Sequence, residues 1–316
     1  MSTAPPVTVI ALCFNHERFV IECLESIKAQ TFRDFELIVT DDCSRDNSAN
    51  LIEKWLSENW QDANFIRHEA NVGICRTLNE ALSVSSGKFI SMIATDDVWE
   101  PHKIEHQLTF MLTLPENVAV VYSDSARIDE LGNRLNLSFI EAHKPGYEPP
   151  SGNIFSSLAD GNFIPAMSTL IRKSAIESVG NYDEELTYED YDMWLRLSHK
   201  FNFFFQPGIV AKYRIVNTSM VRTLFDNPSP NHSYSVFQIC EKWLPSGLLT
   251  PLQRKDWVKK QSSAAYSLYC HNDKRAVPCL WISVFRTWKP KLFLLAVTFS
   301  LGITRGLAKK LTFRQN

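Results

Sequence analysis

Over its first two thirds the chain repeats one pattern: an apolar run, a short polar stretch, and then apolar residues at helical spacing. Residues 7–14 (VTVIALCF) and 35–40 (FELIVT) are nearly continuous apolar runs, which is typical of strands buried on both faces. Between them, Phe19, Cys23 and Leu24 belong to a set that recurs at helical spacing. The chain is therefore predicted to begin with strand, loop, helix and strand.

The same order continues toward residue 94. A second helix carries Leu51, Ile52 and Trp55 on one face, and a third strand is predicted over 64–68. The next helix is expected to stop at Gly87, because glycine readily adopts the left-handed conformation that often ends a helix. A strand over 88–94 follows. This alternation predicts a parallel, doubly wound α/β sheet with right-handed connections.

Beyond residue 101 the elements become more varied. Helices are predicted over 104–111, from 174 to Gly180, and over 186–200, and strands over 118–123, 162–172 and 203–214. We expect residues 124–133 to form a hairpin loop closed at Gly132, and the proline- and glycine-containing stretch 138–160 to form a loop. After residue 214 the rhythm of strands and helices stops.

Two of the predicted strands end in a pair of carboxylates, Asp41 with Asp42 and Asp96 with Asp97. Ligands of open α/β sheets bind beyond the carboxyl ends of the strands, and paired carboxylates there suit a hard divalent cation that is shared with phosphates. No glycine-rich phosphate loop of either common type occurs in this half, so a metal would have to hold the phosphates. The simpler alternative is that Asp96 and Asp97 only open a turn and cap the next helix.

The predicted helix over 186–200 begins with an acidic turn. Thr187 and Asp190 stand at the spacing of a capping box, and Glu189 and Asp192 could simply complement the helix dipole. These residues by themselves therefore leave a structural and a functional interpretation open.

Taken together, these segments resemble the family 2 glycosyltransferases of GT-A fold. The resemblance covers roughly residues 6–220, and the matching segments are 8–46 (TVIALCFNHERFVIECLESIKAQTFRDFELIVTDDCSRD), 71–97 (NVGICRTLNEALSVSSGKFISMIATDD), 121–129 (VYSDSARID), 161–186 (GNFIPAMSTLIRKSAIESVGNYDEEL) and 188–197 (YEDYDMWLRL). The resemblance implies a Rossmann-like mixed sheet with helices on both faces, followed by a C-terminal helical appendage. It also implies an inverting enzyme of the kind found in bacterial surface-polysaccharide synthesis.

By this resemblance, the nucleotide of a sugar donor would be bound by residues of the loops that follow the strands: Ala11, Phe14, Asn15, Asp41 or Asp42, Gly73 and Asp96. Asp97 would hold a divalent metal, Mn²⁺ or Mg²⁺, although Ala94 replaces the first acid of the commoner metal motif. Asp190 would be the catalytic base, because a sugar hydroxyl must lose its proton as it attacks. Glu189, Trp194 and Arg196 would lie on the acceptor side.

Two features of the motif bear on the reaction. Many relatives carry a histidine shortly after the position of Tyr213-Arg214, where this chain has Ile215, Val216 and Asn217. The Arg-x-x-Arg-Trp type of motif of processive relatives is absent, which favours transfer of a single sugar from a UDP- or dTDP-type donor to a glycan or lipid-linked glycan. The alternatives are a catalytically degenerate scaffold or binding subunit, and a sugar nucleotidyltransferase. Nucleic acid binding is not expected.

Charge divides the chain into two parts. Residues 1–225 contain 19 Lys and Arg against 31 Asp and Glu, whereas residues 226–316 contain 14 against 4. We therefore expect a glycosyltransferase domain over 1–225 and a basic helical region over 226–316. The seven cysteines form no Cys-x-x-Cys pair and the N-terminus does not read as a signal peptide, which favours free thiols in the cytoplasm.

The basic region contains an apolar stretch, residues 292–303 (LFLLAVTFSLGI), between Lys and Arg residues. This stretch is too short for a membrane span, but it suits the interface of an anionic membrane. We therefore expect a peripheral contact with the inner face of the cell membrane. The alternative is a tail helix that packs on its own domain or on a second subunit.

Overall fold

The computed structural model describes residues 5–216 and 229–302. Its contacts divide the chain into two compact units. The first comprises residues 1–184 and 189–217, and the second comprises 185–188 and 218–316. Each unit is described by itself below.

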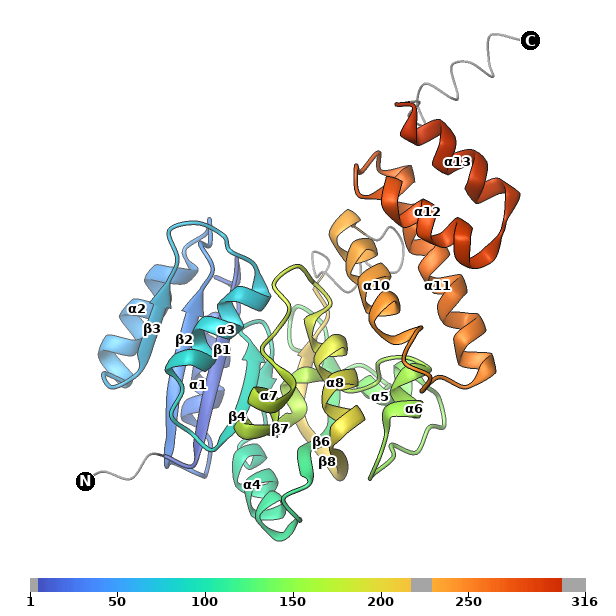
Figure 1. The fold of residues 1–316 in the computed structure, drawn as a ribbon. Coiled ribbons are helices and arrows are strands. Elements are labelled where there is room, and N and C mark those ends of the chain that lie inside the picture. The colour runs from blue at the N-terminus through green and yellow to red at the C-terminus, as the bar shows by residue number, and fades with distance from the viewer. Residues whose placement is uncertain (1–4, 217–228, 303–316) are drawn as a thin grey trace. The chain divides into compact units, whose positions relative to one another are not determined.

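The first unit is built on an eight-stranded mixed sheet (Figure 1). Its strand order is β3-β2-β1-β4-β7-β6-β8-β5, and the strands are β1 (Val7–Cys13), β2 (Phe35–Asp41), β3 (Asn64–Arg67), β4 (Phe89–Ala94), β5 (Val98–Trp99), β6 (Val118–Ile128), β7 (Thr169–Arg172) and β8 (Asn202–Arg214). The strands β3, β2, β1 and β4 are parallel, so their carboxyl ends share one edge of the sheet. β7 is antiparallel to both of its neighbours, β4 and β6.

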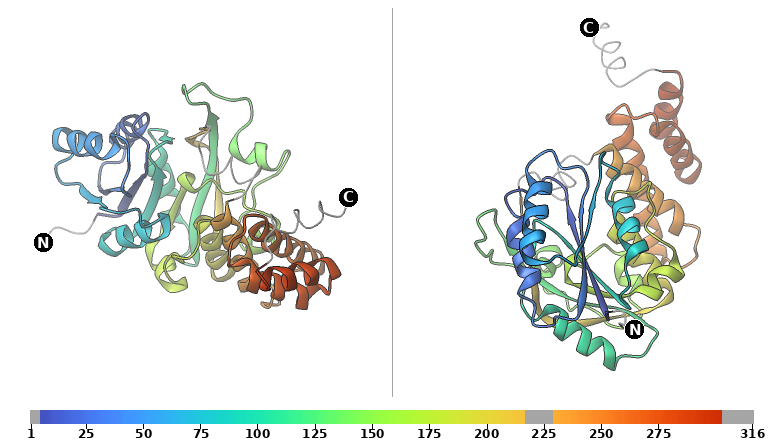
Figure 2. Two further views of the ribbon diagram at one scale, coloured as in Figure 1. Left: turned by 90° about the horizontal axis from the view of Figure 1, so that it is seen from above. Right: turned by 90° about the vertical axis from the view of Figure 1, so that its left-hand side faces the viewer.

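Helices lie on both faces of this sheet (Figure 2). They are α1 (Val20–Lys28), α2 (Ser48–Asn59), α3 (Ile74–Val84), α4 (Lys103–Thr113), α5 (Phe139–His143), α6 (Phe155–Ala159), the 3-10 helix η1 (Ala166–Ser168), α7 (Lys173–Val179) and α8 (Glu189–Lys200). The apolar spacing read from the sequence matches the buried faces, since Val20, Cys23, Leu24 and Ile27 are the buried apolar residues of α1. β1 is almost completely buried at the centre of the sheet.

Several details differ from the sequence prediction. α3 ends at Val84, with Ser85 after it, and Gly87 does not adopt a left-handed conformation. Gly87 instead lies against β1, where a Cβ atom would come within 2.4 Å of the Thr8 backbone nitrogen. Glycine is thus needed here because two backbones approach closely, not because a helix must be capped. The expected loop over 138–160 contains the short helices α5 and α6.

The second unit is helical in its described part. It contains α10 (Pro230–Trp243), α11 (Pro251–Cys270), α12 (Ala276–Thr287) and α13 (Pro290–Ser300). Ser229 caps α10, and Thr250 with Gln253 forms a capping box at the start of α11. Phe237, Ala265 and Leu280 belong to its separate hydrophobic core.

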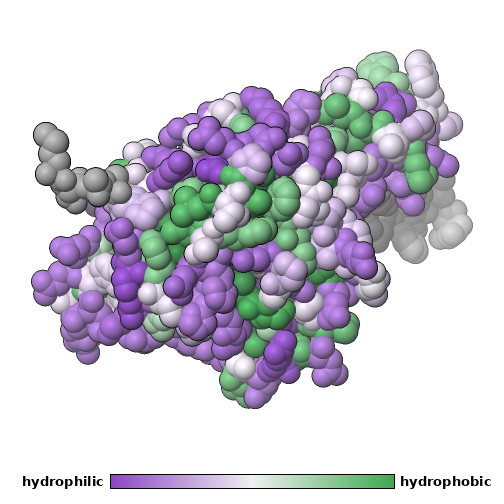
Figure 3. Space-filling model, turned by 90° about the horizontal axis from the view of Figure 1, so that it is seen from below, coloured by the Kyte–Doolittle hydropathy of each residue, from purple (hydrophilic) through white to green (hydrophobic). Residues whose placement is uncertain are grey.

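Large apolar side chains also reach the surface of α12 and α13. Phe285, Trp288, Phe293, Leu294 and Leu301 are all more than half exposed, and Figure 3 shows hydrophobic residues among polar ones on this part of the surface. Within the described residues, no helix combines the length and hydropathy that crossing a membrane requires.

Candidate active site

The carboxyl ends of β1 and β4 meet at the point where the sheet changes its winding direction. From β1 the chain proceeds to β2 on one side, whereas β4 lies on the other side of β1. Such switch points are where open α/β sheets bind ligands. The segments that follow β1 and β4 are in contact here. The Thr95 amide donates to the Leu12 carbonyl (2.9 Å), and His16 Nδ1 lies 2.9 Å from Thr95 Oγ1.

Asp97 is buried at this edge. Its Oδ1 accepts a hydrogen bond from the Arg214 backbone amide of β8 (2.8 Å). Burial, and then the neighbouring Asp96 carboxylate, raise the pKa of Asp97 well above its usual range. Asp96 is less enclosed, and its Oδ2 lies 3.8 Å from His16 Nε2. The paired carboxylates thus occupy the strand end as predicted, in two different environments.

Arg214 of β8 contacts the loop after β4 that carries Asp96 and Asp97. Its side chain is buried, its Nε donates to the Asp96 carbonyl (2.7 Å), and its Nη2 pairs with Glu22 (2.5 Å). The guanidinium also stacks over the Phe19 ring. Because the backbone amide and the side chain of one residue contact consecutive aspartates, Arg214 fixes the geometry of the carboxylate pair. The sequence placed Arg214 in a motif but gave no sign of these contacts.

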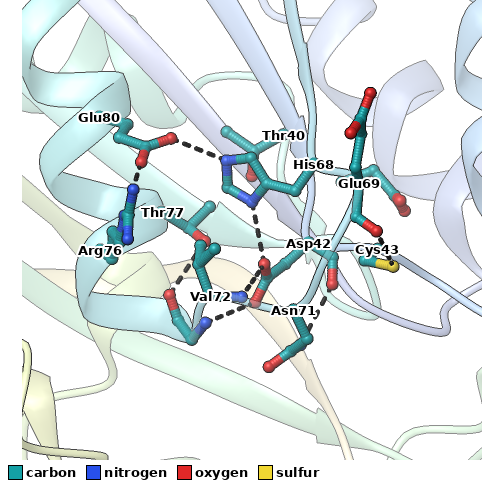
Figure 4. Close-up of polar contacts among 12 residues, drawn as sticks. Thr40, Asp42, Cys43, His68, Glu69, Asn71, Val72, Arg76, Thr77 and Glu80 are labelled. Atoms are coloured by element: carbon teal, nitrogen blue, oxygen red, sulfur yellow. Dashed lines mark hydrogen bonds and ion pairs between the residues drawn. The ribbon is translucent and has the colours of Figure 1, made fainter.

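Asp42, at the end of β2, holds together the loop that leads into α3 (Figure 4). Its carboxylate accepts hydrogen bonds from the Val72 amide (2.8 Å) and the Gly73 amide (2.9 Å), and Oδ1 lies 2.9 Å from His68 Nδ1. His68 Nε2 in turn faces Glu80 at 2.8 Å. Both oxygens of Asp42 are therefore engaged by the chain itself. Gly73 has φ of +87° at the start of α3, a conformation that favours glycine.

Asp41 lies next to β1, since it pairs in register with Cys13. Its carboxylate accepts from the amide and the hydroxyl of Ser44. Asn15, in a left-handed conformation, accepts from the Arg45 amide (2.8 Å) and so ties the first loop to the second.

The remaining two residues predicted in this region differ in their exposure. Phe14 is 42% exposed at the strand end, whereas Ala11 lies inside β1 with no exposed surface.

Asp190 and Glu189 open helix α8. Asp190 Oδ2 accepts from Asn162 Nδ2 (3.0 Å), and Oδ1 accepts from the Tyr191 amide. Burial raises the pKa of Asp190 to about 6, and burial together with Asp190 raises the pKa of Glu189 to about 8. A carboxylate with a pKa near neutrality is suited to accept a proton at physiological pH. The sequence did not single out Asn162 as a functional residue.

The capping box considered for this helix does not fit its register. Since α8 begins at Glu189, Thr187 stands two residues before the first helical residue and Asp190 is the second residue of the helix. A capping box requires the acid at the third helical position. The Thr187 amide donates to the hydroxyl of Ser235 instead (2.8 Å).

Trp194 and Arg196, which were expected on the acceptor side, are engaged in packing and hydrogen bonds within the fold. Trp194 is completely buried and packs edge-on against Phe203, so its ring belongs to the core. Arg196 pairs with Asp192 (2.8 Å) and donates to the Val179 and Gly180 carbonyls at the end of α7. Cations satisfy the free carbonyls at helix ends, which explains an arginine here. Both side chains thus have structural contacts that explain them without an acceptor, whereas Glu189 lies beside Asp190.

Tyr213 of β8 is affected electrostatically by acidic groups from both β4 and α8. Burial, and then Asp97, Asp96 and Asp190, raise the pKa of Tyr213. Tyr213 therefore lies within electrostatic range of all three carboxylates, although they are far apart in sequence.

The donor set agrees with the chemistry of Mg²⁺ or Mn²⁺. In the described ranges, no group of three or more His, Cys, Asp or Glu side chains is arranged to hold a metal ion. Ions of this kind are usually held by one or two carboxylates together with the phosphates of a substrate, and Asp96 and Asp97 supply two carboxylates. Asn217, one of the residues that stand where many relatives carry a histidine, lies outside the described residues.

Comparison with solved structures confirms the expected GT-A fold. A mannosyltransferase from Pyrobaculum calidifontis, solved with GDP-mannose and Mn²⁺, aligns over 98% of this chain and 84% of its own, with a TM-score of 0.60 and 14% identity. The S. aureus protein TarS (residues 1–349), solved with UDP-GlcNAc, aligns over 94% and 92%, with a TM-score of 0.62 and 14% identity.

Sequence comparison identifies the family. A protein of Rickettsia felis described as an uncharacterized glycosyltransferase is 28% identical over 213 residues, which are 66% of this chain and 34% of that protein. The chain thus spans about a third of the length of that relative. The model of glycosyl transferase family 2 matches residues 8–180, more than half of the chain. The chain therefore belongs to glycosyl transferase family 2.

Proposed function

We propose that this enzyme transfers a single sugar, with inversion, from a nucleoside-diphosphate sugar to a hydroxyl of a glycan or lipid-linked glycan. The observation that carries the proposal is the pair of carboxylates Asp96 and Asp97 at the carboxyl end of β4, beside the switch point of the sheet, together with the separate carboxylate of Asp190 at the start of α8. One pair of carboxylates suits the cation of a diphosphate, and the separate carboxylate suits an acceptor hydroxyl.

In this proposal Asp190 is the general base. The acceptor oxygen attacks the anomeric carbon, the bond from that carbon to the diphosphate oxygen breaks, and the acceptor proton passes to Asp190. A single displacement inverts the anomeric centre. The pKa of Asp190, about 6, leaves its carboxylate ionised at neutral pH and able to accept that proton. Glu189, with a pKa of about 8, stays protonated beside it.

In this proposal the nucleotide sugar binds at the carboxyl ends of β1, β2 and β4. Asp97 and Asp96 would hold Mn²⁺ or Mg²⁺, which supplies positive charge for the diphosphate leaving group. Phe14 presents an exposed ring, and Asn15, Asp41 and Gly73 shape the loops around it. Either Asp41 or Asp42 would contact the nucleotide, and each already accepts hydrogen bonds from the chain, Asp41 from Ser44 and Asp42 from the Val72 and Gly73 amides. The neighbouring structures with GDP-mannose and UDP-GlcNAc support a nucleotide sugar as donor.

The second unit supplies contact with an anionic membrane at its cytoplasmic face. The apolar side chains on α12 and α13 lie beside Lys289 and Lys291, which are both exposed. Each cation near anionic lipid contributes about 1 kcal/mol. Deleting residues 286–316 should abolish salt-sensitive co-sedimentation with anionic vesicles while nucleotide binding persists. A full-length protein that stays in the supernatant with these vesicles at low salt would remove this part of the proposal.

A thermal-shift screen of nucleotide sugars, with and without Mn²⁺, tests the catalytic proposal. A ligand that binds only the folded state raises its apparent stability, by about 2.7 kcal/mol at a hundred times the dissociation constant. We expect a UDP- or dTDP-sugar to raise the melting temperature only when Mn²⁺ is present. Turnover of that donor must then release nucleoside diphosphate. A panel without any shift, or full turnover in EDTA, would contradict the proposal.

A further inference from the structure

We propose that His16 is a nitrogen ligand of the divalent cation, acting together with Asp96. This inference rests on the proposed function, because it concerns the ion that would hold the donor diphosphate. It adds a residue from the β1 loop to a site otherwise built from the end of β4.

His16 stands at the switch point of the sheet, between the two strands that diverge there. Its Nδ1 lies 2.9 Å from Thr95 Oγ1, and its Nε2 faces Asp96 Oδ2 at 3.8 Å. The side chains of His16 and Asp96 are 22% and 16% exposed. The pair is therefore partly shielded from bulk water and still open to a ligand.

The backbone of His16 is held on both sides. Its amide donates to Ser48 Oγ (2.9 Å), and its carbonyl accepts from the amides of Phe19 and Val20 (2.9 Å each) at the start of α1. With the ring also anchored through Thr95, the direction of Nε2 is determined before any ligand arrives. Preorganisation of this kind is typical of binding sites.

The arrangement matches the way in which histidine usually binds metals. A ligating imidazole normally hydrogen-bonds through its second ring nitrogen, which fixes the tautomer. When Nδ1–H donates to Thr95 Oγ1, Nε2 keeps a free lone pair at 3.8 Å from Asp96 Oδ2. Neighbouring donors that are each about 2.1 Å from one octahedral ion lie about 3 Å apart, so the 3.8 Å gap must close by somewhat less than about 1 Å when an ion binds both.

Asp97, the second carboxylate proposed to hold the ion, and Arg214 are themselves held in place next to His16 and Asp96. Asp97 Oδ1 is held by the Arg214 amide, and Arg214 pairs with Glu22. An imidazole ligand is softer than a carboxylate, so it favours Mn²⁺ over Mg²⁺. A site of His16, Asp96, Asp97 and diphosphate oxygens is accordingly expected to prefer manganese.

Electron spin-echo spectroscopy of Mn²⁺ bound to the full-length protein, with UDP in one series and GDP in another, tests the inference. Protein labelled with ¹⁵N-histidine separates imidazole from the nitrogens of the base. His16→Asn keeps an amide near the Nδ1 position but has no Nε2, and His106→Asn, on the exposed face of α4, is the matched control. We expect ¹⁵N coupling in the wild type and in His106→Asn, and its loss in His16→Asn.

Affinity gives a second readout. His16→Asn should weaken Mn²⁺ binding in the presence of UDP by at least about tenfold and should lower the preference for Mn²⁺ over Mg²⁺. Thr95→Val, which removes the anchoring hydroxyl, should weaken Mn²⁺ binding less and keep the nitrogen coupling.

The two couplings separate this inference from the proposed function. Coupling to ³¹P without ¹⁵N coupling would overturn the role of His16 and leave the metal-bound diphosphate intact. Coupling to ¹⁵N that persists in His16→Asn would also overturn it. Coupling to ¹⁵N without ³¹P would support His16 as a ligand and contradict a metal-bound diphosphate. If the wild type showed neither ¹⁵N nor ³¹P coupling, both the role of His16 and the metal-bound diphosphate would be contradicted.

Discussion

Replacing Asn162 with alanine tests whether the amide beside Asp190 tunes the pKa of this proposed general base. In the wild type, Asn162 Nδ2 donates to Asp190 Oδ2 across 3.0 Å. A hydrogen bond of this kind favours the ionised carboxylate, and it partly offsets the burial that raises the pKa of Asp190 to about 6. Its removal should therefore raise this pKa further.

The size of the effect follows from the energy of the bond. A hydrogen bond to a charged group contributes about 1.5–3 kcal/mol, and the lower end applies because Asp190 is only partly shielded from solvent. This corresponds to about one pKa unit, which would move Asp190 from about 6 to about 7. At pH 6 the ionised fraction falls from about one half to about one tenth, whereas at pH 8 it stays near about nine tenths. Turnover should accordingly fall about fivefold at pH 6 and hardly at all at pH 8.

The assay is the release of nucleoside diphosphate at saturating donor and acceptor, between pH 5 and pH 9. Asn153→Ala is a matched control. Asn153 Oδ1 accepts from the Phe155 amide at 3.2 Å, just as Asn162 Oδ1 accepts from the Ile164 amide at 3.2 Å, but only Asn162 is hydrogen-bonded to Asp190. Both variants lose the same type of turn, so only the contact with Asp190 distinguishes them.

Two results would refute the reasoning. The first is an acid limb of Asn162→Ala that coincides with those of the wild type and Asn153→Ala. The second is a wild-type rate that falls as the pH rises from 5 to 7, because a general base must gain activity as it loses its proton.

Three further changes have defined outcomes. Asp97→Asn preserves the shape of the side chain but removes its charge, so turnover should fall at least about a hundredfold; unchanged turnover of this variant would show that Asp97 is not needed for the metal. Asp190→Asn should lose on the order of 10² to 10⁴ in turnover while the donor Kd stays within about twofold, and near-normal turnover would exclude the base. The folded-state pKa of Asp190, about 6, exceeds the usual 3.8, so ionisation of this group destabilises the fold as the pH rises above 3.8. Asp190→Asn should therefore have a higher melting temperature than the wild type at pH 8. The difference in melting temperature should vanish near pH 4. Gly87→Ala should destabilise the fold by about 1–3 kcal/mol, since its Cβ would meet the Thr8 backbone at 2.4 Å, and an unchanged urea midpoint would contradict that close approach.

The sequence by itself determined the class of fold and the positions of the main carboxylates. Apolar runs such as 7–14 become strands because a strand buried on both faces must be apolar throughout, and this is a local property. The ends of these runs locate Asp41 and Asp97, since the carboxyl ends of parallel strands share one edge. The order of the segments was also sufficient for the resemblance to glycosyl transferase family 2, which the family model confirms.

The tertiary structure alone decided which of these residues face each other. Spacing shows on which face of its own helix Trp194 or Arg196 lies, but not that the first face packs on Phe203 and that the second meets the end of α7. The close approach of Gly87 to β1 and the meeting of His16 with Asp96 join residues 79 and 80 positions apart. Such contacts depend on how strands and helices pack in space, and packing is set by many weak interactions across the whole chain that no local pattern records.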